Sequence, residues 1–80
     1  MNSVKAYEEI VDFIASGTTP KNVISFRPSD DAQERVDLLL AQKSKGALSV
    51  KEESELEHFL RLEHLMRLAK ARAYAFLSNE

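Results

Sequence analysis

The chain has 80 residues and a formal net charge of −2, so it forms at most one domain with a small hydrophobic core and has no bulk attraction for nucleic acid. It contains no cysteine, which excludes disulfides, thiolate metal sites and thiol nucleophiles. No apolar run approaches the roughly 18 residues of a membrane span, and the start is acidic where a signal peptide would be basic, so we expect a soluble cytoplasmic protein.

The first predicted helix covers about residues 3–16. Ser3 can cap its start, and Gly17 can end it in a left-handed turn. Its apolar residues recur at spacings of three and four, which indicates one buried stripe on a helix. They are Val4, Tyr7, Ile10, Val11 and Ile14.

The next segment is irregular, with a short helical turn expected at about residues 20–25 because Thr19 and Pro20 are typical of a helix start. Phe26 and Arg27 follow it. An exposed aromatic–arginine pair would be a candidate loop anchor for a partner. In the alternative, which we favour, Phe26 fills the core and Arg27 meets an aspartate of the next helix.

A second helix is predicted at about residues 29–45. Ser29 can cap it, and the acids at Asp30 and Asp31 oppose the positive end of the helix dipole. Gly46 ends it. The apolar positions expected to face the core are Ala32, Val36, Leu39 and Leu40, with Leu38 on the flank.

The last helix is long and is predicted at about residues 50–77. Ser49 and Glu52 form a capping box, and no glycine or proline interrupts the chain after them. No segment has the pattern of a strand. We therefore predict an all-α single domain over residues 1–80, with two short helices, a turn and a long C-terminal helix.

The long helix carries a heptad-like apolar seam. At 1.5 Å per residue it is about 42 Å long, whereas a compact chain of this size is about 30 Å across. The two short helices should leave part of the seam bare, and a second copy is the economical cover. The predicted dimer interface consists of Phe59, Leu62, Leu65, Met66, Ala69, Ala73 and Phe76.

A near-repeat lies at residues 56–67, where two consecutive six-residue stretches begin with Leu-Glu-His and end with Arg. Six helical residues rotate the second copy by about 120°, so the two histidines cannot share a face. The other polar residues form favourable (i, i+4) pairs instead, Glu57 with Arg61 and Glu63 with Arg67.

A metal site is a remote alternative. Glu55 and His58 match the Glu-x-x-His element of di-iron helical bundles, but such sites need inward-facing glutamates from two further helices. The sequence also lacks a nucleophile motif and the size for a ligand pocket. We expect no metal, no cofactor, no catalytic residue and no enzymatic activity.

Positive charge gathers at the C-terminal end, where residues 61–80 hold four of the 11 basic residues and two of the 13 acidic ones. These cations are candidate contacts for a partner or for phosphate, although they also suit the C-terminal half of a helix. The same stretch is too rich in alanine for a membrane-surface helix. The four are Arg61, Arg67, Lys70 and Arg72.

The pattern FRPS…LEHLMRLAKARA across residues 26–73, with IVDFIASGTTP before it, resembles a family of small uncharacterised bacterial proteins common in cyanobacteria. The resemblance implies no activity. In size and character the chain is also similar to the antitoxin half of toxin–antitoxin pairs. We predict a non-enzymatic protein-interaction or regulatory module, antitoxin-like, that acts as a helical homodimer with an unidentified protein partner. The alternative is a small nucleic-acid-binding regulator that uses the basic face of the last helix.

Overall fold

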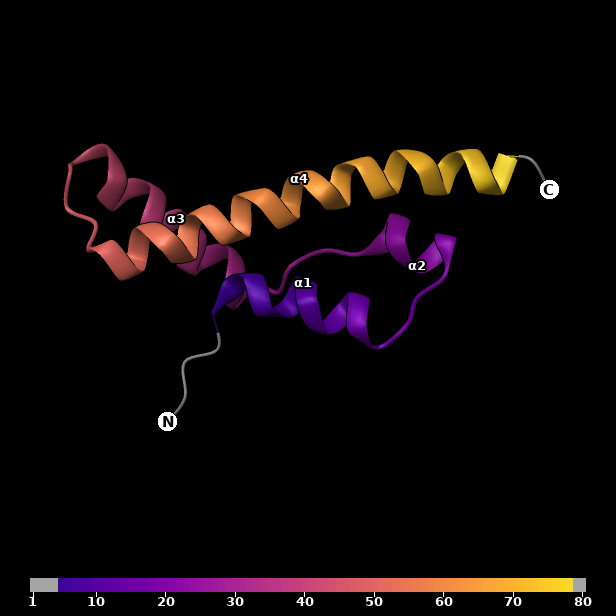
Figure 1. Cartoon of the computed structure of the whole chain (residues 1–80), viewed down its shortest axis with the longest axis horizontal. Helices are drawn as coiled ribbons and strands as arrows, with labels where there is room; N and C mark the ends of the chain where they lie inside the picture. The colour runs from indigo at the N-terminus through magenta and orange to yellow at the C-terminus, as the bar shows by residue number, and fades with distance from the viewer. Residues whose placement is uncertain (1–4, 79–80) are drawn as a thin grey trace.

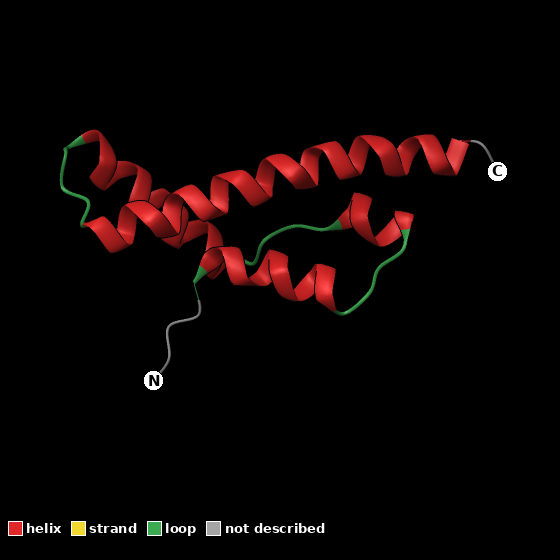
Figure 2. Cartoon of the chain, in the orientation of Figure 1, coloured by secondary structure: helices red, strands yellow, loops and turns green. Residues whose placement is uncertain are grey.

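The computed structural model describes residues 5–78 and builds them from helices alone, which confirms the all-α prediction for this part of the chain. The helices are α1 (Ala6–Ala15), α2 (Pro20–Ser25), α3 (Asp30–Ser44) and α4 (Val50–Ser78). In Figure 1, α4 runs along the length of the molecule, α1 and α2 follow one another on one side of it, and α3 crosses near its start. Figure 2 shows that short loops join them. The molecule measures 48 × 28 × 19 Å, so it is elongated along α4.

Helix α1 buries only part of the predicted stripe: Ile10 is buried and Tyr7 packs against the core, as expected. Ala6 and Ile10 are buried and Phe13 packs against the core, a spacing of four and three. Val11 and Ile14 were expected in the stripe but are exposed. The side of α1 that meets α3 and α4 is therefore rotated towards Phe13, which the prediction omitted. The predicted cap at Ser3 and the apolar Val4 lie outside the described residues.

Three helix starts are capped by the residues that the sequence indicated. The Thr19 hydroxyl accepts from the Asn22 N–H at 3.2 Å, and the Ser29 hydroxyl accepts from the N–H of residue 32 at 3.1 Å. Ser49 and Glu52 exchange bonds of 3.0 and 3.1 Å. The backbone bond from Ser49 lowers the pKa of Glu52, because it stabilises the charged carboxylate.

Two glycines end helices in the left-handed conformation, as the sequence predicts for Gly17 and Gly46, with φ of 83° and 69°. After α3 the Gly46 N–H donates to the Lys43 carbonyl at 3.0 Å, and the Ala47 N–H donates to the Gln42 carbonyl at 2.9 Å. This pair of bonds is a Schellman motif. It reverses the chain so that α4 can return along α3.

The core lies where α1 and α3 meet α4. Its most deeply buried large side chains are Ile10, Leu39, Leu56 and Phe59. Partly buried Tyr7, Phe13, Val23, Phe26, Leu48 and Leu62 surround it. Leu38 and Leu40 are exposed, although Leu40 was expected to face inward.

The predicted seam of α4 is covered mainly by its own chain. Phe59, Met66 and Ala73 are all buried, so these three side chains are not available to a second copy, contrary to the prediction. Helices α1 and α2 lie one after the other along α4 (Figure 1), so their combined length covers more of the seam than their separate lengths predict. In this elongated arrangement the two short helices cover a greater length of α4 than they could in a compact, spherical domain of the same size.

None of the helices in residues 5–78 combines the length and apolar character needed to cross a membrane.

The Leu39→Ala variant should lower the free energy of unfolding by about 2–5 kcal/mol, because it opens a cavity in the core. Leu38 is the matched control: it is the preceding residue of the same helix but is 48% exposed, so Leu38→Ala should cost less than about 1 kcal/mol. Urea unfolding followed by circular dichroism measures both. Equal losses in the two variants would show that the face of α3 is assigned wrongly.

Candidate functional site

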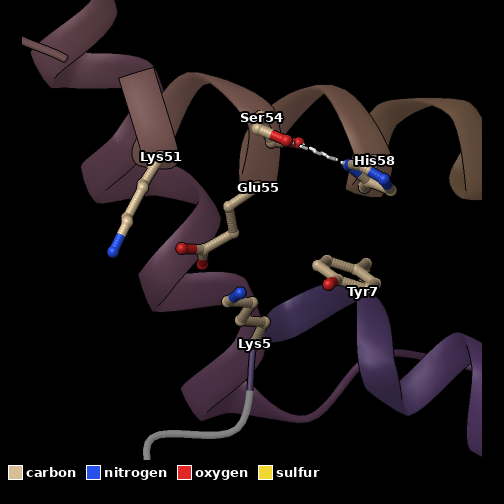
Figure 3. Close-up of a pocket in the computed structure, with 6 residues that line it drawn as sticks. All are labelled: Lys5, Tyr7, Lys51, Ser54, Glu55 and His58. Atoms are coloured by element: carbon tan, nitrogen blue, oxygen red, sulfur yellow. Dashed lines mark hydrogen bonds between the residues drawn. The ribbon is translucent and has the colours of Figure 1, made fainter. Parts of the chain in front are cut away.

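The first candidate site is a cavity of about 240 Å³ at the junction of α1 and α4, shown in Figure 3. It is lined by Lys5, Tyr7, Lys51, Ser54, Glu55 and His58. His58 Nδ1 lies 2.7 Å from the Ser54 carbonyl oxygen, which can only accept, so Nδ1 carries the proton. The His58 ring stacks on Tyr7 with a centroid distance of 5.1 Å. The histidine therefore serves as a packing contact between α1 and α4.

Glu55 is the buried acid beside this cavity, with a side chain only 7% exposed. Its two carboxylate oxygens accept from Arg35 of α3, from Nε at 2.9 Å and from Nη2 at 3.0 Å. The hydrogen bond to Glu55 raises the pKa of Arg35. A bidentate pair of this kind satisfies a buried carboxylate, and it ties α3 to α4.

The candidate metal pair, Glu55 and His58, is engaged elsewhere. Glu55 is bonded to Arg35, and His58 lies against Ser54 and Tyr7 (Figure 3). No cluster of three or more metal-ligating side chains occurs in residues 5–78. Glu55 lies near the start of α4, yet its side chain is buried against α3. Its partner Arg35 is 20 residues away and was not singled out, because an (i, i+20) pair has no local sequence signal.

Two of the C-terminal cations form the exposed ion pairs that the spacing predicts. Arg61 Nη2 lies 3.2 Å from Glu57 Oε1, and Arg67 Nη2 lies 3.2 Å from Glu63 Oε1. Both confirm the (i, i+4) interpretation. Pairs this exposed add little stability, and they leave those two guanidiniums already facing a carboxylate.

Lys70 turns inward instead. Its Nζ donates to the Phe26 carbonyl at 2.9 Å, a contact that joins α4 to the loop after α2. Burial lowers the pKa of Lys70, and the positive charge of Arg27 lowers it further. The partner of Lys70, the Phe26 carbonyl, is 44 residues away in the chain and could not be predicted from the sequence.

The loop residues Phe26 and Arg27 form a second candidate site with Lys70. Phe26 is partly buried and packs on Phe13 with a centroid distance of 4.6 Å, which agrees with the favoured interpretation. Arg27 does not pair with Asp30 or Asp31, as that interpretation expected. Its Nη1 donates to the Phe26 carbonyl at 2.8 Å and to the carbonyl of residue 24 at 3.4 Å.

This second site is a cavity of about 240 Å³ between the loop and α4. The structure thus unites the candidate loop anchor with part of the candidate basic face. The lining residues are Ile10, Phe26, Arg27, Pro28, Gln33, Glu63, Met66, Arg67 and Lys70.

The third candidate is an exposed apolar side of α4. Leu65, Leu68 and Phe76 are 50%, 56% and 59% exposed. Phe76 also borders an apolar groove of about 230 Å³ between the start of α2 and the end of α4, where Ala69 and Ala73 form part of the wall. Of the predicted interface residues, Leu65 and Phe76 are exposed, and Leu62 and Ala69 are partly buried. The prediction missed Leu68, because a seam counted from Phe59 places it on the opposite side.

No protein-family model, curated protein or solved structure matches the chain.

Removing Arg35 should destabilise the fold because it leaves the Glu55 carboxylate buried without its donors. We expect Arg35→Ala to lower the free energy of unfolding by about 1–3 kcal/mol, towards the lower end because Arg35 is 37% exposed and water can partly replace it. Arg61→Ala removes an exposed pair as the control and should cost about 0–1 kcal/mol. Urea unfolding measures both losses. A loss for Arg35→Ala no larger than the control would rule out a structural role for the pair.

Proposed function

We propose that the protein is a non-enzymatic protein-interaction module that acts as a homodimer, with the exposed apolar side of α4 packed against the same side of a second copy. The observation that carries the proposal is the group of large apolar side chains left in solvent there, Leu65, Leu68 and Phe76. Large apolar side chains gathered on one exposed side of a helix often mark a protein–protein interface.

The three side chains share one side of the helix. At about 100° per residue they fall within an arc of roughly 80°. Phe59 and Met66, which α4 buries in its own chain, lie on the other side. The helix therefore uses one side to complete the domain and presents another to solvent.

Self-association is the most economical use of this surface. A patch near a two-fold axis meets itself, so one set of residues provides both halves of an interface. An 80-residue chain buries a limited core, and a second copy would add apolar burial where α4 has least cover. The proposed interface is smaller than the sequence predicted, because it excludes Phe59, Met66 and Ala73.

A regulatory, antitoxin-like role would use the same surface for a different protein. The nucleic-acid alternative has less support from the geometry. Arg61 and Arg67 already face carboxylates, and Lys70 is directed at the Phe26 carbonyl. Arg72 is the remaining member of the predicted basic face, and one exposed arginine does not make a phosphate-binding stripe.

Replacing both leucines, as Leu65→Glu with Leu68→Glu, should convert a dimer into a folded monomer. Four carboxylates would be forced together at the interface, and the apolar burial would be lost. We expect the dissociation constant to rise by about 100-fold or more, since roughly 3 kcal/mol corresponds to burial of one to two leucines. Sedimentation equilibrium at micromolar concentrations measures this.

The control is Leu38→Glu, which places one glutamate at a similarly exposed leucine of α3 and should leave the dimer intact. Circular dichroism checks that all variants keep their helical content. The proposal fails if the wild-type chain sediments as a monomer throughout the micromolar range, or if the control dissociates the dimer as strongly as the double variant.

A further inference from the structure

We propose that the cavity between the loop at residues 26–28 and α4 binds a compact oxyanion, a phosphate or carboxylate group, through Arg27 and Lys70. This inference is independent of the proposed dimer. Its basis is the arrangement of cations around one backbone oxygen.

The Phe26 carbonyl oxygen accepts from Arg27 Nη1 at 2.8 Å and from Lys70 Nζ at 2.9 Å. The two nitrogens therefore lie within about 6 Å of each other. Two positive charges held this close repel each other. A carbonyl dipole offsets part of that repulsion, whereas a full negative charge between the two cations would offset much more.

The surrounding residues supply only part of that negative charge, because Glu63 is the one carboxylate among the lining residues and its charge acts on Lys70. Neither Arg27 nor Lys70 has a carboxylate within 4 Å among the ion pairs of residues 5–78. Glu63 is the acid that lines the cavity, and it is already paired with Arg67 at 3.2 Å. The cavity thus presents three cations against one carboxylate.

Hydrogen-bond donors remain for a ligand. Lys70 has three ammonium donors, and one of them meets the Phe26 carbonyl. Arg27 uses Nη1 for both of its bonds to protein, so Nε and Nη2 have no protein acceptor within the described chain. Charged donors of this kind form short, strong bonds with oxyanions, and arginine can bind them with two parallel bonds.

The size of the cavity limits the ligand. About 240 Å³ is many times the space that one water molecule needs, but it is below the range of about 300–1,000 Å³ typical of drug-sized ligands. The wall includes Ile10, Phe26 and Met66, which bound the charged end with apolar surface. This geometry suits inorganic phosphate or the carboxylate of a small organic acid.

The test is a nuclear magnetic resonance titration of the full chain, labelled with ¹⁵N, with inorganic phosphate and separately with acetate. Sodium chloride keeps the ionic strength constant, because non-specific anion effects depend on salt. We expect saturable shifts in the amides of Phe26, Arg27 and Lys70 and in the Arg27 side-chain Nε. Tighter binding of phosphate indicates a phosphate ligand, and tighter binding of acetate indicates a carboxylate ligand.

Variants then assign the binding to the two cations. Arg27→Gln should weaken binding about tenfold, the equivalent of one charge-assisted hydrogen bond. Lys70→Arg preserves the charge and should retain binding within about threefold, whereas Lys70→Met should lose it. Arg72→Gln is the matched control, since it removes one charge from α4 outside this cavity, and should change affinity by less than about twofold.

Two results would overturn the proposal. One is shifts that grow linearly with both anions or spread equally over all basic residues, which would mean that the anions only screen charge. The other is wild-type affinity in both Arg27→Gln and Lys70→Met, with dispersed spectra showing that the variants fold. In that case the contacts of Lys70 and Arg27 with Phe26 only fasten the loop to α4.

Discussion

Helix α4 has 29 residues and, at 1.5 Å per residue, is about 43 Å long in a molecule whose longest dimension is 48 Å. Every other helix contacts α4, and α1 and α3 also contact each other, so the domain is organised along this single helix. The chain covers one side of α4 with α1 and α2 placed end to end, and α3 crosses near its start (Figure 1). The other sides of α4 remain in solvent. Its leucines on those sides are exposed because no other helix of the chain packs against them.

Polar contacts determine how α1 and α3 are oriented relative to each other and to α4. The Glu9 carboxylate of α1 accepts from both the N–H and the hydroxyl of Ser29, the residue that caps α3. Arg35 of α3 holds Glu55 of α4. Each contact joins positions 20 residues apart. Apolar packing alone allows a helix to rotate or slide at modest cost, whereas directional bonds such as these favour one arrangement. We infer that they determine the orientation of α3 between α1 and α4.

The sequence predicts local structure well because local structure has local causes. Thr19, Ser29 and Ser49 cap the helices that follow them, and Gly17 and Gly46 end the helices before them. These effects act within a few residues, so a pattern of residue types suffices to find them. The bounds of α3 and α4 consequently lie within one residue of the predicted ranges.

The candidate sites were less accessible from sequence. Heptad spacing correctly indicates that Phe59 and Met66 are buried, but it does not say whether the same chain or another one buries them. Lys70 and the Phe26 carbonyl are 44 residues apart, and a backbone acceptor has no residue-type signature. The sequence identified Phe26, Arg27 and Lys70 as candidates for separate reasons. Only the path of the loop along α4 shows that they line one cavity.

The two proposed surfaces can operate at the same time because they use different sides of α4. Leu68 and Lys70 are two residues apart and therefore project about 160° from each other. Lys70 reaches inward to the loop, whereas Leu68 extends into solvent. A ligand held by Arg27 and Lys70 would not compete with a second copy packed on Leu65 and Leu68. The same long helix thus separates a charged cavity, shaped by its own chain, from an apolar face left for a partner.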